Sequence, residues 1–147
     1  MRPSPHLASL AALALLAALV AAPTQAAPSA YRVIVNQATA VTALDRKFLT
    51  DSFLKKTTRW PTGELIRPVD LGPDSAVRRR FTEDVMNRSV AAVKSYWQSL
   101  IFSGRAVPPP ELDSDEEVMR YVAKHAGAVG YVSGVAELTG VKVVAVK

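Results

Sequence analysis

The stretch VDLGPDSAVRRRFTEDVM, residues 69–86, decides how the rest of the chain is arranged. An apolar run stops at Asp70, and Gly72 and Pro73 then make a tight turn. A pattern with helical period begins after Ser75, which is a favoured type of N-cap residue. The apolar side chains of this helix recur every fourth residue: Val77, Phe81 and Val85. The stretch therefore predicts a strand, a turn and a helix whose apolar stripe faces a sheet.

Three arginines in a row stand at the start of this predicted helix. The first turn of a helix carries unpaired N–H groups and the positive end of the macrodipole, so acidic residues are favoured there and arginine is not. Arg79 can reach Glu83, and Arg80 can reach Asp84, across one turn of the helix. Arg78 has no acidic partner at that spacing.

Two interpretations of Arg78 stay open. A bound oxyanion would take hydrogen bonds from the amides of Val77 and Arg78, from the hydroxyl of Ser75 and from one guanidinium. Alternatively, the helix has an ordinary solvated start, which tolerates an unfavourable charge of roughly a few tenths of a kcal/mol. The first interpretation requires the tip of the helix to face solvent or a neighbouring protein.

The N-terminal region has the pattern of a secretory signal peptide. Arg2 supplies a positive charge, and residues 7–22 form an Ala- and Leu-rich run that only Ser9 interrupts. Small residues then lead to an expected cleavage site after Ala26, so residues 1–26 are interpreted as the signal and residues 27–147 as one domain. The alternative is an uncleaved anchor, although the run is shorter than the roughly 20 residues of a spanning helix. The expected location is the periplasm.

Composition narrows the classes of function further. The chain contains no cysteine, which excludes disulfides, thiol catalysis and Cys-based zinc sites. The formal net charge is +5, and removal of Arg2 with the signal leaves 17 basic against 13 acidic residues. This small excess supports a mild attraction for anions. Because no basic stripe with interleaved aromatic residues occurs, nucleic acid is not an expected partner.

The other elements predict an α/β fold with helices flanking one sheet. Strands are expected at residues 31–36, 65–70, 128–132 and 141–146, and Pro68 indicates an edge or irregular pairing. Helices are expected after three further N-caps, at Asp45, Ser89 and Ser114, of which the last forms a capping box with Glu117. The Pro-rich residues 103–112 are expected to cross the surface as an extended segment.

Two further residues are interpreted as structural. Trp60 is expected to close the end of the core, the alternative being to stack on a ligand. His125 is expected at the C-terminal end of a helix, where a cation interacts well with the dipole. It is the only histidine in residues 27–147, and a lone histidine provides neither a metal cluster nor a catalytic triad, so the protein is not expected to be an enzyme.

Four segments in this order resemble the periplasmic phosphate-binding proteins of ABC transporters, and more closely the short exported forms that keep little more than one lobe. The segments are FLTDSFLKKTTRWPTG (48–63), PVDLGPDSAVRRRF (68–81), YWQSLIFSGR (96–105) and SDEEVMRYVAKHAGAVGYV (114–132). The resemblance runs from about Val33 to Val132. It implies a single three-layer lobe, similar to one domain of a type II periplasmic binding protein, with a mixed sheet flanked by helices.

The resemblance also implies a site for inorganic phosphate or another oxyanion. In that family a strand ending in Arg-x-Asp is followed by a Ser-Gly-Thr turn at a helix N-terminus. Asp70 and Ser75 match the acidic residue and the serine. Ala76 and Val77 stand where glycine and threonine would be, and Pro68 stands where the arginine would be, with Arg67 and Arg78 nearby. The implied ligand-binding residues are Asp70, Ser75, Ala76, Val77 and Arg78.

Two functions follow as expectations. The first is an exported solute-binding-like protein that binds an oxyanion as part of, or derived from, an ABC phosphate uptake system, with a transporter permease or other membrane protein as partner. The second is an interaction or sensor-type module of the same fold with a degenerate ligand site, whose partner is a membrane protein or a second copy. The opposite lobe is expected to be missing, because about 30 residues precede Asn36. No cofactor is expected.

Overall fold

A five-stranded mixed sheet forms the centre of the protein in the computed structural model, which describes residues 29–147. The expected signal peptide lies outside the described residues. The strand order is β2-β7-β1-β6-β3, in which β1 is antiparallel to β6 and β7 while β2 and β3 pair in parallel at the two edges. The strands are β1 (Tyr31–Asn36), β2 (Ala43–Leu44), β3 (Arg67–Pro68), β6 (Ala128–Ser133) and β7 (Val141–Val146).

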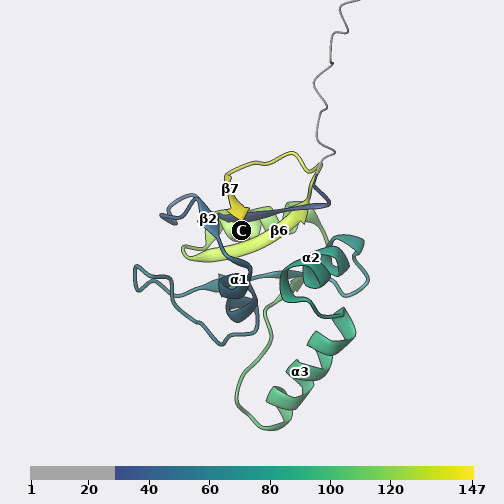
Figure 1. Cartoon of the computed structure of the whole chain (residues 1–147). Coiled ribbons are helices and arrows are strands. Elements are labelled where there is room, and N and C mark those ends of the chain that lie inside the picture. The colour runs from purple at the N-terminus through teal and green to yellow at the C-terminus, as the bar shows by residue number, and fades with distance from the viewer. Residues whose placement is uncertain (1–28) are drawn as a thin grey trace, which may run out of the picture.

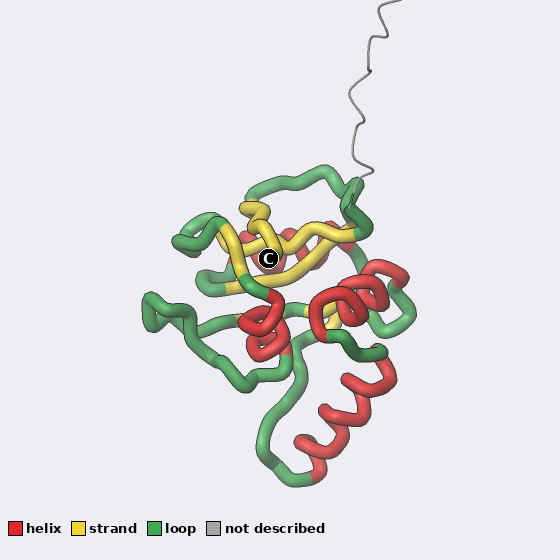
Figure 2. Tube along the Cα trace, viewed as in Figure 1, coloured by secondary structure: helices red, strands yellow, loops and turns green. Residues whose placement is uncertain are grey.

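Helices cover both faces of this sheet, which makes three layers (Figure 1). On one face Tyr131 of β6 stacks on Phe81 of α2 (Ala76–Met86), and its ring lies 5.8 Å from that of Phe53 of α1 (Arg46–Phe53). On the other face Gly130, the neighbouring residue in β6, lies against Val118 of α4 (Asp115–Lys124). Figure 2 shows the same arrangement, with strands between helices. The predicted α/β fold is confirmed.

Most of the predicted elements begin where their caps indicated. Strands 31–36 and 141–146 are β1 and β7, and helices follow N-caps at all four predicted positions: Asp45, Ser75, Ser89 and Ser114. The serine side chains each accept a hydrogen bond from the backbone N–H three residues later. The starts of the helices therefore follow from hydrogen bonds between residues close in sequence.

The predicted strand 65–70 is divided. β3 follows the edge of the main sheet only as far as Pro68, and β4 (Asp70–Leu71) pairs in parallel with β5 (Glu111–Leu112) in a separate two-stranded sheet. Pro68 has no N–H to donate, in agreement with its predicted place at an edge. The end of segment 103–112 is therefore a strand and not only a surface crossing. This strand carries Glu111 to the start of α2.

The third helix, α3 (Val90–Phe102), contributes less to the core than its apolar composition predicts. Its buried side chains are Val93 and Trp97, whereas Ile101 and Phe102 are exposed. Figure 1 shows α3 standing away from the sheet at one end of the molecule. None of the helices within residues 29–147 combines the length and the apolar character needed to cross a membrane.

Gly130 allows α4 to lie close to the sheet, so we expect a side chain there to destabilise the fold. A Cβ at this position would lie 2.8 Å from Val69 Cγ1 and 2.9 Å from Val118 Cγ1. Gly130→Ala should lower the free energy of unfolding by about 1–3 kcal/mol, measured by urea denaturation. Gly72→Ala is the matched control, because its added Cβ would meet ordinary contacts at 3.7 Å. Equal stability of the two variants would contradict the close approach.

Candidate functional site

The first turn of α2 is open to solvent at three of the predicted ligand residues. Ala76 is exposed, and Ser75 and Val77 are half-buried. The Ser75 Oγ accepts a hydrogen bond from the Arg78 amide at 3.2 Å and keeps its own proton free to donate. The amides of Ala76 and Val77 belong to the first turn, where the helix supplies no acceptor. The tip thus offers three donors to an anion.

Arg78 points away from this open tip into the protein. Its Nη1 atom donates to the Leu71 carbonyl at 2.8 Å and to Glu111 Oε1 at 2.6 Å. Its Nη2 atom lies 3.6 Å from Asp70 Oδ2, and only 5% of the side chain is exposed. As expected, Arg78 has no acidic partner one turn away along the helix, but it has acidic partners elsewhere in the fold. Its partners lie on β4 and β5, which sequence spacing does not bring together.

Asp70 is the buried centre of this cluster. It accepts a hydrogen bond of 2.5 Å from the Tyr131 hydroxyl, which itself accepts a hydrogen bond from the Leu71 amide at 3.4 Å. Burial raises the pKa of Asp70, while the charge of Arg78 and the hydrogen bond from Tyr131 oppose that rise. Burial and the nearby charge of Asp70 raise the pKa of Tyr131, so this hydroxyl stays protonated and donates. Asp70 is thus held by groups from two other elements.

Arg78 carries its positive charge within this cluster. Burial opposes that charge, but Asp70 and Glu111 outweigh burial, so the pKa of the guanidinium is raised. The single guanidinium lies against two carboxyl groups, so its positive charge is already paired within the cluster. The structure therefore divides the five predicted ligand residues into an open tip, Ser75 to Val77, and a buried ion pair, Asp70 with Arg78.

Sequence reasoning missed two members of this cluster. Glu111 follows a run of three prolines, and no motif or spacing connects it with α2. Tyr131 lies within the GAVGYV run, where its apolar neighbours indicated only a buried strand. Because a buried tyrosine hydroxyl usually forms a hydrogen bond, a tyrosine in this apolar run indicated that a polar partner lies near it.

A groove lies next to Arg78, between α2, α3 and the extended segment that precedes β5. It has a volume of about 480 Å³. We call it the α3 groove, and its lining includes Pro73, Arg78, Lys94, Trp97, Ile101 and Glu111. Its lining is mostly apolar, apart from the charged side chains of Arg78, Lys94 and Glu111. The side of this cluster at Arg78 and Glu111 therefore borders a largely apolar groove.

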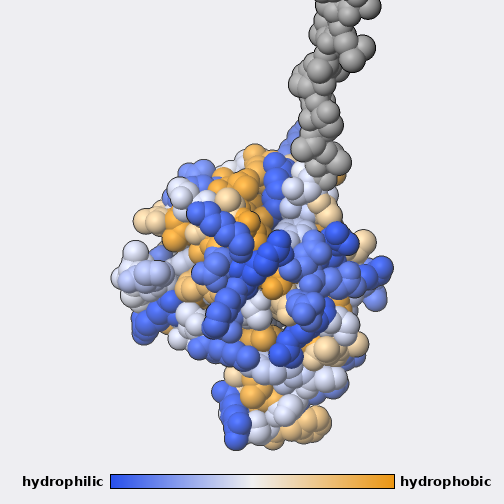
Figure 3. All heavy atoms as spheres, in the orientation of Figure 1, coloured by the Kyte–Doolittle hydropathy of each residue, from blue (hydrophilic) through white to orange (hydrophobic). Residues whose placement is uncertain are grey.

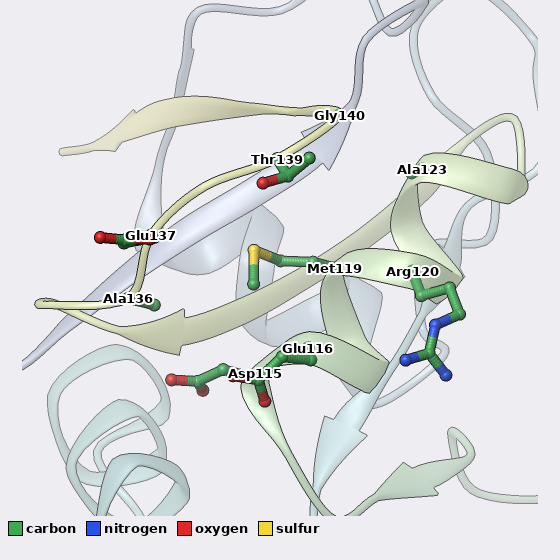
Figure 4. A pocket seen from close by; sticks show the side chains of 9 residues that line it. All are labelled: Asp115, Glu116, Met119, Arg120, Ala123, Ala136, Glu137, Thr139 and Gly140. Atoms are coloured by element: carbon green, nitrogen blue, oxygen red, sulfur yellow. The ribbon is translucent and has the colours of Figure 1, made fainter.

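A second hollow, of about 720 Å³, lies between α4 and residues 136–140 (Figure 4). Three carboxylates line it, those of Asp115, Glu116 and Glu137, together with Arg120. Glu116, Glu137 and Arg120 are exposed to solvent. Within residues 29–147, no three His, Asp or Glu side chains gather in a way that could hold a metal ion. This hollow is therefore not the candidate ligand site.

The two residues interpreted as structural occupy the predicted places. Trp60 is 3% exposed, and its Nε1 atom donates to the Gly127 carbonyl at 3.0 Å. His125 follows the last turn of α4, where its Nδ1 atom lies 2.7 Å from the Tyr121 carbonyl and its ring stacks on that of Tyr121. Both side chains are engaged within the fold, so neither belongs to the candidate site.

Several solved structures with a similar fold carry names that describe phosphate transport. The chain is similar to an ABC-type phosphate transport receptor from Vibrio cholerae (22% identity, TM-score 0.60) and to PstS from Borrelia burgdorferi (12%, 0.59). It is also similar to a substrate-binding protein from Clostridium perfringens, proposed to serve a phosphate ABC transporter, with phosphate bound (20%, 0.63). Each match covers 80% of this chain. No protein-family model and no curated protein matches the sequence.

These similarities establish the fold. The matches cover 46%, 47% and 44% of the three receptors in the order given, so this chain spans less than half of their length. The fold is that of one lobe of these binding proteins, as the sequence resemblance implied.

The buried pair gives a prediction about stability and pH. Arg78→Met leaves Asp70 buried without its cation, so we expect a loss of about 3–5 kcal/mol in the free energy of unfolding near pH 7.5. Without Arg78 the pKa of Asp70 should rise further, because that cation opposes the rise caused by burial. Asp70 is neutral at a pH below its pKa in the folded wild type and in the folded variant, and a neutral Asp70 needs no cation. The loss of stability should therefore shrink on acidification to about pH 4.5. Urea denaturation at both pH values measures it.

Arg79→Met is the control for this experiment. Arg79 is exposed, so its replacement should change stability by no more than about 0.5 kcal/mol at either pH. An equal loss for Arg78→Met at both pH values would show that the charge of Asp70 is not what Arg78 stabilises.

Proposed function

We propose that this protein is an exported, single-lobe binding protein that takes phosphate or a similar oxyanion at the start of α2, as part of or derived from an ABC phosphate uptake system. The observation that supports this proposal is the open tip of α2, where Ser75, Ala76 and Val77 direct three donors outward. The fold is shared with proteins whose names describe phosphate receptors. A helix N-terminus also favours negative charge through its dipole.

Binding at this tip should be weak. A phosphate withdrawn from water needs many donors to replace its hydration, and the tip supplies three. The Arg78 guanidinium adds little, because Asp70 and Glu111 already neutralise it. We expect a dissociation constant in the millimolar range, which corresponds to about −4 kcal/mol.

The proposed setting is the periplasm, reached through the signal peptide at residues 1–26, with residues 27–147 as the working domain. A transporter permease or another membrane protein is the proposed partner. We assign no catalytic step: His125, the one histidine within residues 29–147, follows the last turn of α4 and contacts Tyr121.

A second function is favoured by a different observation. The neutralised Arg78 and the α3 groove beside it suit an interaction module whose ligand site has degenerated. In that function the open side of the groove meets a membrane protein or another copy of the chain. Absence of any anion response, together with a mass that depends on concentration, would favour this second function.

Ser75 provides the direct test of anion binding. Calorimetry with phosphate, sulfate and chloride should show a saturable phosphate response that weakens at least threefold in Ser75→Ala, because this change removes one donor and the helix cap. Ser95→Ala, at an exposed position of α3, is the control and should leave affinity unchanged. Unaltered affinity in Ser75→Ala would place the site elsewhere, and no response in the wild type would reject the first function.

Glu111 provides a complementary test. Glu111→Gln removes the carboxylate that contacts Arg78, so the positive charge of Arg78 becomes available and the repulsion of an incoming anion falls. We expect phosphate affinity to rise several-fold, by the same calorimetric titration. Glu116→Gln makes the same chemical change at an exposed position on α4 and should have no effect. Equal affinities in the two variants would show that Arg78 does not take part.

A further inference from the structure

Exposed apolar side chains gather at one end of the molecule. Three of the six large hydrophobic residues that are exposed within residues 29–147 fall between positions 101 and 107. They are Ile101, Phe102 and Val107, with exposed fractions of 51%, 91% and 66%. Figure 3 shows apolar surface among polar surface at the lower end of the molecule, where Figure 1 places α3. A cluster of this kind marks a contact surface more than a solvated one.

One face of α3 lines the groove beside this cluster. The residues of that face follow one another at intervals of four, three and four: Val90, Lys94, Trp97 and Ile101. This spacing is typical of a seam along which two helices pack. The opposite wall of the groove is formed by Pro73, Pro108 and Glu111, with Arg78. The groove therefore leaves part of one long side of α3 open.

We propose that a second copy of this chain docks at the α3 groove, with the two α3 helices antiparallel about a twofold axis near Gln98. In a twofold interface the same surface is used by both partners, so each contact occurs twice. Phe102 lies four residues after Gln98 and Lys94 lies four residues before it. The ring of Phe102 from one copy then faces Lys94 of the other and enters its groove.

The chemistry of the groove suits this occupant. Trp97 and Val90 provide apolar contacts, and the stem of Lys94 adds more. Lys94 is exposed and forms no ion pair in the part of the chain that the structure describes, so its ammonium can approach the face of the incoming ring. Glu111, whose side chain is 44% exposed, lines the same groove as Lys94.

The proposed contact surface is also large enough for a dimer. Two Phe102 rings would bury roughly 300–500 Å² between them. A standard interface buries roughly 1,600 Å² in total, and the length of α3, about 20 Å for 13 residues, with residues 105–110 beside it, can supply the remainder.

This proposal deepens the second candidate function and does not depend on anion binding at Ser75. A monomeric protein that binds phosphate would reject the dimer and leave the first function in place. A dimer that binds no phosphate would support the proposed interface and reject the first function.

Cysteine placement tests the geometry, because the chain has no cysteine of its own. In protein expressed from the full-length chain, Gln98→Cys should form a disulfide-linked dimer on mild oxidation, since position 98 lies next to the proposed axis. Val135→Cys is the control, because Val135 is also exposed, at 75%, but lies in the turn after β6. Equal cross-linking of both variants, or none of Gln98→Cys, would overturn the proposal.

Sedimentation equilibrium tests the energetics without a covalent bond. The wild type should show a mass that rises toward that of a dimer with concentration, and Phe102→Asp should weaken the association at least tenfold. Val135→Asp introduces the same charge at an exposed position away from α3 and should associate like the wild type. Circular dichroism confirms that each variant is folded. A wild type that stays monomeric, or a Phe102→Asp variant that still dimerises, would contradict the interface.

Discussion

The buried contact between Arg78 and Asp70 is the constraint on which the rest of the site depends. Neither charge can remain in the interior alone, because removal from water is costly for each. Asp70 is therefore held by the Tyr131 hydroxyl as well as by Arg78, and Arg78 also contacts Glu111 and the Leu71 carbonyl. These bonds join the first turn of α2 to β4, β5 and β6. They fix where the tip of α2 points.

The same contact limits what that tip can do. The helix start is capped by Ser75, and a helix N-terminus in general favours negative charge. Yet the nearest arginine is turned inward and neutralised, so the donors that face solvent are a hydroxyl and two amides. The open side of the cluster leads instead into the α3 groove, which is mainly apolar. The proposed anion site at the start of α2 and the proposed docking surface in the α3 groove therefore lie beside each other.

Close packing explains why the layers lie where they do. Gly130 lets Val69 and Val118 approach the sheet on one face, while Tyr131 packs against Phe81 on the other. The alternation along β6 thus assigns one helix layer to each side, as expected for a strand buried on both faces. α3 lies outside this sandwich, which is why its C-terminal end stays exposed.

The sequence by itself determined the elements. Caps at Asp45, Ser75, Ser89 and Ser114 are local patterns, and hydrogen bonds between residues close in sequence enforce them. The apolar runs at 31–36 and 141–146 are local patterns too, although the strands that they form are held by long-range pairing. The motifs also indicated the fold, which the solved receptors share. Only the tertiary structure decided the state of Arg78, because its carboxylates lie 8 residues before it and 33 residues after it in the chain. Long-range pairing of this kind depends on how β4 and β5 meet, and no residue spacing encodes that meeting.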